Sequence, residues 1–251
     1  MAKFLFESDE EFKQYMSDTL AYVNMQNTVS KLVSFVKPQY MIEFGSGNGA
    51  TSLRLAKENP KTSIVAVDLR EKMIGLSKEK LFQNRVSNVT FINNDLTNLE
   101  NYNLGNANLI LMMYSFKYIA DPDSKKENFL KDLYSRMREG AYLIIGDTFL
   151  EEGATKEDVK RQLEDRYYNN SKDVFWNNLK GLSEEDVKYA FDVQTINRMH
   201  TKDQVKFGVD RDGVYYVSRE WLKKTAKKVG FKVLLGERLN SLSDTIFVLQ
   251  K

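Results

Sequence analysis

A glycine cluster preceded by a carboxylate is the part of this sequence best suited to chemistry. Glu43 stands two residues before the loop Gly45-Ser46-Gly47-Asn48-Gly49, which joins the apolar run 40–44 to a helical pattern. Glycines allow positive φ and a close ligand, and the N–H groups of the new helix point at that ligand. A carboxylate before such a loop would repel a pyrophosphate but would attract an ammonium or sulfonium group. These residues predict a nucleotide-like ligand with a positively charged end.

Two further acids stand at the ends of apolar runs. Asp68 closes the run 63–68, where a group that only accepts hydrogen bonds suits both hydroxyls of a ribose. The same side chain would also cap a helix that begins near Arg70. Asp95 follows the strand expected over 89–92, in an Asn-Asn-Asp stretch that could also form an ordinary turn. The ordered set of three acids is more specific than the glycines alone.

Residues 42–49 follow the order hydrophobic-Glu-hydrophobic-Gly-x-Gly-x-Gly, which resembles motif I of the class I S-adenosylmethionine-dependent methyltransferases. The resemblance covers about residues 40–147 and 215–250. It implies that Asp68 binds the ribose, that Leu69 packs against the adenine, and that Asp95 accepts a hydrogen bond from the adenine amine. The expected contacts with S-adenosyl-L-methionine are Glu43, Gly45, Ser46, Gly47, Gly49, Asp68, Leu69, Asp95, Leu96 and Tyr114.

Tyr114 is the residue expected nearest to the transferred methyl group. It follows the nearly continuous apolar run 107–113, which predicts a strand buried on both faces, and strand ends of this kind face the ligand crevice. The next residues resemble the L-H-x-[LI]-x-D-P pattern of small-molecule methyltransferases, but Lys117 replaces its histidine. Catechol-type relatives bind magnesium with acids after both the fourth and the fifth strand. Because only Asp147 is present here, we expect no metal site.

The remaining segments predict one Rossmann-like α/β domain over residues 1–251. We expect a doubly wound seven-stranded sheet whose last strand is antiparallel by the family resemblance, with helices over about 125–138 and after Ser218. Two helical patterns, one from Ser8 to Val23 and one from Val29 to Val36, would form an N-terminal cover over residues 1–38. Tyr15 and Tyr22 on the first would approach the sulfonium through their rings, although core packing is the simpler interpretation.

Residues 151–212 exceed an ordinary connection and predict an insertion folded over the crevice as a lid. A homodimer interface that buries its aromatic clusters is the competing interpretation. The only histidine of the chain, His200, lies near its end and is the natural general base if the acceptor must lose a proton. A lone histidine in a polar stretch is more often simply solvated.

Composition restricts the partners of this 251-residue chain. The net charge of +2, from 37 basic and 35 acidic side chains, provides no field for a polyanion, so no nucleic acid is expected. Four lysines, at 223, 224, 227 and 228, are better interpreted as a solvated helix face. There is no cysteine, and no segment has the ~20 apolar residues that cross a bilayer. We therefore expect a cytoplasmic protein that contacts no membrane.

The sequence thus predicts an enzyme that moves a methyl group to an oxygen, nitrogen or carbon nucleophile of a small molecule. A methyltransferase acting on a protein or RNA would need an open, basic rim in place of an aromatic lid. A non-catalytic module that only binds S-adenosylmethionine has the same sequence pattern. A NAD-dependent dehydrogenase would fit Gly45–Ala50 and Asp68, but it would fit neither Glu43 nor the two closing strands.

Overall fold

A seven-stranded mixed sheet organises the chain in the computed structural model, which describes residues 20–119, 123–153, 215–239 and 244–251. The strand order is β3-β2-β1-β4-β5-β7-β6. The first five strands are parallel, and β7 is antiparallel to both of its neighbours, β5 and β6. The strands are β1 Tyr40–Phe44, β2 Ser63–Asp68, β3 Val89–Asn93, β4 Leu109–Met113, β5 Tyr142–Thr148, β6 Lys232–Arg238 and β7 Asp244–Gln250. The predicted fold class is confirmed.

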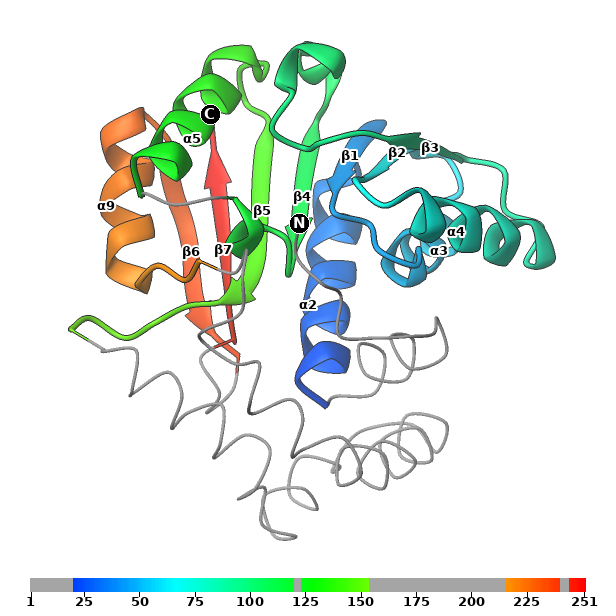
Figure 1. Cartoon of the computed structure of the whole chain (residues 1–251), viewed down its shortest axis with the longest axis horizontal. Coiled ribbons are helices and arrows are strands. Elements are labelled where there is room, and N and C mark those ends of the chain that lie inside the picture. Colours follow the sequence, from blue (N-terminus) through cyan, green and yellow to red (C-terminus); the bar gives the residue numbers. More distant parts are fainter. Residues whose placement is uncertain (1–19, 120–122, 154–214, 240–243) are drawn as a thin grey trace, which may run out of the picture.

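Helices cover both faces of this sheet (Figure 1). Helix α2 packs beside α3 and against β5 and β7, while α5 and α9 lie against each other and α9 contacts β6. The helices are α2 Leu20–Val36, α3 Ala50–Glu58, α4 Glu71–Gln83, α5 Asp123–Arg136 and α9 Arg219–Val229, with short 3-10 turns η1 Leu99–Asn101, η2 Leu104–Asn106 and η3 Phe116–Tyr118. Among the described helices, none is long and apolar enough to span a bilayer.

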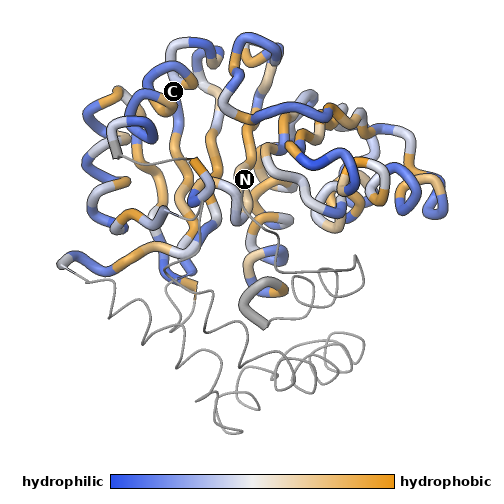
Figure 2. The backbone as a smooth tube through the Cα atoms, viewed as in Figure 1, coloured by the Kyte–Doolittle hydropathy of each residue, from blue (hydrophilic) through white to orange (hydrophobic). Residues whose placement is uncertain are grey.

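The core is divided by the sheet into two clusters of buried side chains. Ile42 and Phe44 of β1 belong to one cluster, and Met41 belongs to the other, because side chains alternate along a strand. The strands are therefore apolar on both faces, as a parallel sheet between two helix layers requires. Figure 2 shows the hydrophobic residues concentrated along the strands, with hydrophilic residues on the outer sides of the helices.

Helix α2 runs without a break from Leu20, near the end of the first expected helical pattern, through the whole of the second. Met25, Val29 and Val33 recur every four residues and are fully buried, so the polar stretch between the two patterns is also helical. Gly146 of β5 makes room for this helix, because a Cβ there would lie 2.5 Å from the Met25 sulfur. The part of the expected cover before residue 20, including Tyr15, and the side chain of Tyr22 lie outside the described residues.

The ends of the later elements agree with their predicted caps, whereas β5 is longer than expected. The Ser218 hydroxyl accepts a hydrogen bond from Trp221 N–H at 3.0 Å, and Gly230 ends α9 with φ of 121°. Strand β5 continues through Gly146 and Asp147 to Thr148, because β7 pairs with these residues as well. Of the insertion expected over residues 151–212, residues 154–212, including His200, lie outside the described residues.

Candidate active site

The glycine loop leaves β1 and turns sharply at the edge formed by the carboxyl ends of the parallel strands. Gly45 and Ser46 both donate backbone hydrogen bonds to Val67 O, at 2.8 and 2.9 Å. Gly45, Gly47 and Gly49 have φ values of 77°, 54° and 73°, a region that other residues rarely adopt. Gly49 then occupies the N-cap of α3. The turn that the sequence predicted is therefore present.

Neighbouring segments pack tightly on two of these glycines. A Cβ on Gly45 would lie 2.4 Å from Ser115 Cβ, just after β4, and the Ser115 hydroxyl donates to Phe44 O at 2.7 Å. A Cβ on Gly49 would lie 2.7 Å from the Ser77 hydroxyl oxygen of α4. The loop is thus held between the ends of β1 and β4, the place where the strand order reverses and where open α/β sheets bind ligands.

Asp68 connects the tip of β2 to this loop. Its Oδ2 accepts from Gly47 N–H at 2.8 Å, and its Oδ1 accepts from Arg70 N–H at 2.9 Å. Arg70 Nε lies 3.4 Å from the same Oδ1. Arg70 itself, rather than Asp68, occupies the N-cap position of α4. Oδ2 therefore keeps a lone pair that can accept a second hydrogen bond. The next residue, Leu69, is 66% exposed, as expected for a side chain that packs on a ligand ring.

Glu43 lies beneath the loop rather than at its surface. The side chain is 2% exposed and accepts a hydrogen bond from the Ser52 hydroxyl in the first turn of α3. Burial raises the pKa of Glu43 from 4.5 to about 7; the Ser52 hydrogen bond opposes the rise, and the negative charge of Asp68 adds to it. The site therefore contains a buried carboxylate that a nearby cation would stabilise.

We expect Glu43→Gln to stabilise the ligand-free protein above neutral pH. Because the folded carboxyl holds its proton to a higher pH than the unfolded one, the native state binds more protons between about pH 4.5 and 7, and wild-type stability falls as pH rises through that window. Above pH 7 the variant should be more stable by about 3 kcal/mol, and below pH 4.5 the two should be equal. Urea unfolding at both pH values measures the difference; equal stabilities above pH 7 would contradict the raised pKa.

Asp95 and Leu96 follow β3 at the same edge of the sheet. Asp95 Oδ1 accepts from the backbone N–H and the hydroxyl of Thr97, at 2.8 and 2.7 Å, which is the Asx turn of the alternative interpretation. The Tyr102 hydroxyl donates to Asp95 O at 2.6 Å, and Leu96 packs against the core. The segment is held in place, and the adenine role of Asp95 stays a prediction.

Tyr114 lies directly after β4 in a left-handed conformation, with φ of 54°, which is unusual for a bulky residue. Its N–H donates to Gly146 O at 2.7 Å, and its hydroxyl donates to Asp244 Oδ2 at 3.2 Å. Asp244 Oδ1 accepts from the Thr148 hydroxyl at 2.9 Å. Backbone strain of this kind persists where surrounding contacts enforce it and is concentrated at functional sites. The ring is 8% exposed, and its role near the methyl group stays a prediction.

Lys117 and Asp147 form a buried ion pair beside Tyr114. Lys117 Nζ lies 2.9 Å from Asp147 Oδ1 and 4.7 Å from the centre of the Tyr114 ring. Asp147 also accepts from Lys117 N–H at 3.1 Å. No cluster of three or more acidic or histidine side chains suitable for a metal ion occurs in the part of the chain that the structure describes. The charge of the Asp147 carboxylate is compensated by the Lys117 ammonium.

A cofactor with a nucleoside and a cationic end fits these residues. Among the described residues, the buried Ser46 hydroxyl in the loop has no hydrogen-bond partner. A buried polar atom of this kind calls for a partner. The acidic Glu43, the left-handed glycines, Asp68 and the exposed Leu69 supply the other contacts. The site thus contains polar groups that a bound ligand would satisfy.

Comparison with known proteins identifies the family. A family model described as a methyltransferase domain matches residues 37–202, which is more than half of the chain. The chain belongs to this methyltransferase family. The matched residues include β1, the glycine loop and every strand through β5.

Two curated relatives of this methyltransferase have stated activities. A carboxy-S-adenosyl-L-methionine synthase of Nautilia profundicola is 26% identical over 176 residues, or 67% of this chain and 71% of the relative. A release factor glutamine methyltransferase of Fusobacterium nucleatum is 35% identical over 66 residues, which span 26% of this chain and 19% of that protein.

Solved structures share the fold of this methyltransferase. An O-methyltransferase family protein from Burkholderia thailandensis matches with a TM-score of 0.58 and 14% identity over 94% of this chain and 58% of that chain. A SAM-dependent methyltransferase from Aquifex aeolicus matches with a TM-score of 0.55 and 16% identity, covering 96% and 97% of the two chains. The chain spans less than two thirds of the Burkholderia protein, so the likeness shows the fold.

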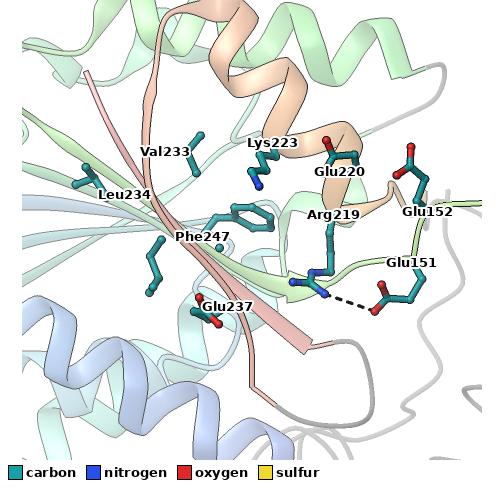
Figure 3. Close-up of a pocket in the computed structure, with 11 residues that line it drawn as sticks. Glu151, Glu152, Arg219, Glu220, Lys223, Val233, Leu234, Glu237 and Phe247 are labelled. Carbon is teal, nitrogen blue, oxygen red and sulfur yellow. Dashed lines mark ion pairs between the residues drawn. The ribbon is translucent and has the colours of Figure 1, made fainter.

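A separate hollow of about 430 Å³ lies at the β6 edge of the sheet, between α9 and β6. Figure 3 shows its mixed lining of acidic and basic side chains from α9 and the segment after β5, with Phe247 at its base. Arg219 forms an ion pair with Glu151 there at 3.6 Å. None of the residues predicted to bind the cofactor lines it, so the candidate active site of the methyltransferase remains at the glycine loop.

Asp244 and Thr148, which hydrogen bonds link to the predicted site residue Tyr114, were not predicted from the sequence. Both lie where β7 begins beside the end of β5, because antiparallel pairing brings the start of β7 to the carboxyl edge of the parallel strands. The sequence feature that could have indicated Asp244 is its position immediately before the last apolar run. The partnership of Lys117 and Asp147 was also missed, although each residue had been noted separately.

Proposed function

We propose that this chain transfers the methyl group of S-adenosyl-L-methionine to an oxygen, nitrogen or carbon nucleophile of a small molecule. The observation that carries the proposal is the buried Glu43 carboxylate below a left-handed glycine loop, because burial makes this group costly to ionise without a nearby cation. The ammonium end of the cofactor would supply that cation and lower the pKa of Glu43. The match to a methyltransferase family over residues 37–202 supports the same function.

The proposed donor site uses groups that the fold holds rigidly. Ser46 and the N–H groups at the start of α3 would bind the amino-acid end of the cofactor, Asp68 would accept from the ribose, and the exposed Leu69 would cover the adenine. Bound cofactor supplies a methyl group on a sulfonium, which leaves readily to a nucleophile in line with it. Alignment of the two reactants can supply about 7 to 11 kcal/mol of the barrier, more than one general base usually provides.

A small acceptor is supported by the near-neutral charge of the chain and by the small-molecule O-methyltransferases among its structural neighbours, such as the mitomycin 7-O-methyltransferase, with a TM-score of 0.59 and 10% identity. We propose that residues 1–251 form one domain, in which 1–38 cover the donor site and 151–212 close over the acceptor or form a dimer interface. An acceptor on a protein or RNA remains the alternative of the same reaction class.

A second candidate activity is favoured by the relative from Nautilia profundicola, a carboxy-S-adenosyl-L-methionine synthase that matches over 67% of this chain. An enzyme of that kind modifies the cofactor itself. The two activities differ in their products. Methyl transfer releases S-adenosylhomocysteine together with a methylated acceptor, whereas the second activity yields carboxylated cofactor.

Calorimetric titration tests the donor assignment. We expect the wild type to bind S-adenosylhomocysteine and not NAD⁺. Glu43→Gln should bind S-adenosylhomocysteine at least about tenfold more weakly above pH 7, because the ammonium loses its counter-charge. A chain that binds NAD⁺ and ignores the methyl donor would overturn the proposal. Mass analysis of the cofactor after incubation with small-molecule acceptors then separates methyl transfer, carboxylation and binding without turnover.

His200→Ala should leave most of the turnover intact, because alignment contributes more than a base to methyl transfer. The measurement is the rate of S-adenosylhomocysteine release at saturating donor. A loss greater than about a hundredfold would show that His200 is the general base.

A further inference from the structure

Lys117 stands beside the crevice in which methyl transfer is proposed to occur. It lies in η3, two residues after Ser115, which touches the glycine loop. Its partner Asp147 lies in β5, the strand adjacent to β4. Both residues therefore belong to the carboxyl edge of the sheet, on the side of β4 away from the ribose acid Asp68. That is where an acceptor would approach the methyl group.

The Lys117 ammonium is a permanent cation in a fixed place. Its side chain is 14% exposed, and its Nζ lies 2.9 Å from Asp147 Oδ1. Burial by itself lowers the pKa of Lys117, but the charge of Asp147, Tyr118 and Tyr216 and the hydrogen bond to Asp147 together raise it by more, so the pKa lies above its usual value. Lys117 therefore stays protonated and cannot replace the missing histidine as a base.

The ion pair leaves hydrogen-bonding capacity on the lysine. Asp147 is shared with two backbone donors, because Thr148 N–H lies 2.8 Å from Oδ1 and Lys117 N–H lies 3.1 Å from Oδ2. An ammonium has three donors, and Asp147 is the one hydrogen-bond acceptor that the described residues give it. The rings of Tyr114 and Tyr118 lie 4.7 and 5.6 Å from Nζ and form an aromatic wall beside it. An anionic ligand next to this wall would find donors available.

We propose that Lys117 binds an ionised oxygen of the methyl acceptor, so that the substrate is a phenol or an aromatic carboxylic acid methylated on that oxygen. The proposal rests on the proposed function and names its substrate class. An adjacent cation increases the ionised fraction of an acidic O–H group by about ten- to a thousandfold. The fixed ammonium thus performs by charge what a base would perform by removing a proton.

Methyl transfer to the ionised oxygen conserves atoms, electrons and charge. The acceptor O–H loses its proton to water when it binds beside Lys117, and the oxyanion attacks the methyl carbon. A C–O bond forms as the S–C bond breaks, and the sulfur keeps the electron pair of that bond. One positive and one negative charge are consumed, and the products are a methyl ether or ester and a neutral thioether.

Paired probes test this assignment on the full chain saturated with S-adenosylhomocysteine. We would titrate benzoate against benzamide, and 4-nitrophenolate against 4-nitroanisole, above pH 7 and follow binding by ligand NMR. The wild type should bind at least one anion about tenfold or more tightly than its neutral partner. Lys117→Met should reduce that ratio to about one, and Lys117→Arg should retain most of it.

Two further variants keep the test decisive. Lys117→Met leaves the buried Asp147 without its partner and can impair folding, so the double variant Lys117→Met/Asp147→Asn removes both charges together. Lys224→Met on α9 makes the same charge change at a 68% exposed position and should leave the ratio unchanged. Equal binding of anions and neutral partners by the wild type, binding of none of them, or a preference that survives in the double variant overturns the proposal. Loss of S-adenosylhomocysteine binding counts against the proposed function instead.

Discussion

Gly45→Ala should destabilise the fold by about 4 kcal/mol or more and abolish donor binding. Gly45 has φ of 77°, which an alanine adopts only with strain. The new Cβ would also lie 2.4 Å from Ser115 Cβ, so the segment after β4 would have to move away from the loop. Urea unfolding gives the stability, and calorimetry with S-adenosylhomocysteine gives the binding.

Gly75→Ala is the matched control for this substitution. Gly75 lies inside α4, and a Cβ there meets no described atom within 4 Å. Alanine in a helix interior is better than glycine by about 0.5 to 1 kcal/mol, so this variant should be slightly more stable than the wild type and should bind the donor normally. Equal behaviour of the two alanine variants would show that the loop does not need its left-handed glycine.

Asp68→Ala should abolish donor binding, with a loss on the order of a hundredfold or more in affinity. The substitution removes the acceptor expected to bind the ribose and also leaves Gly47 N–H and Arg70 N–H without their partner. Calorimetry with S-adenosylhomocysteine measures the affinity, and circular dichroism confirms that the variant is folded.

Two controls separate the ribose contact from the support of the loop. Asp68→Asn keeps a carbonyl oxygen for Gly47 N–H, so it should fold normally and bind the donor with intermediate affinity. Asp132→Ala removes an exposed carboxylate of α5 whose ion-pair partner among the described residues is Arg136, one helical turn away, and it should change neither property. Unchanged affinity in a folded Asp68→Ala variant would contradict the ribose assignment.

Local sequence patterns were sufficient to predict most of the strands and helices and the glycine loop. Strand β1, its glycines and the caps Ser218 and Gly230 agree with the sequence prediction, because each depends on a short-range property: alternation, backbone freedom or a cap hydrogen bond. The break expected between the two N-terminal helices, after Val23 and before Val29, is absent. The polar stretch between them is helical in α2 because Met25 packs over Gly146 of β5, which local propensity does not report.

The sequence by itself determined the buried strands, the glycine turn and the acids at the strand ends, because hydrophobic periodicity, glycines and helix caps act over a few residues. Only the tertiary structure decided which side chains face one another. Tyr114 meets Asp244 across 130 residues, and Lys117 meets Asp147 across 30, because strand order brings them to one edge. That packing sets how deeply Glu43 and Lys117 are buried and which groups contact them. The pKa values of the two side chains therefore follow from the packing and not from spacing along the chain.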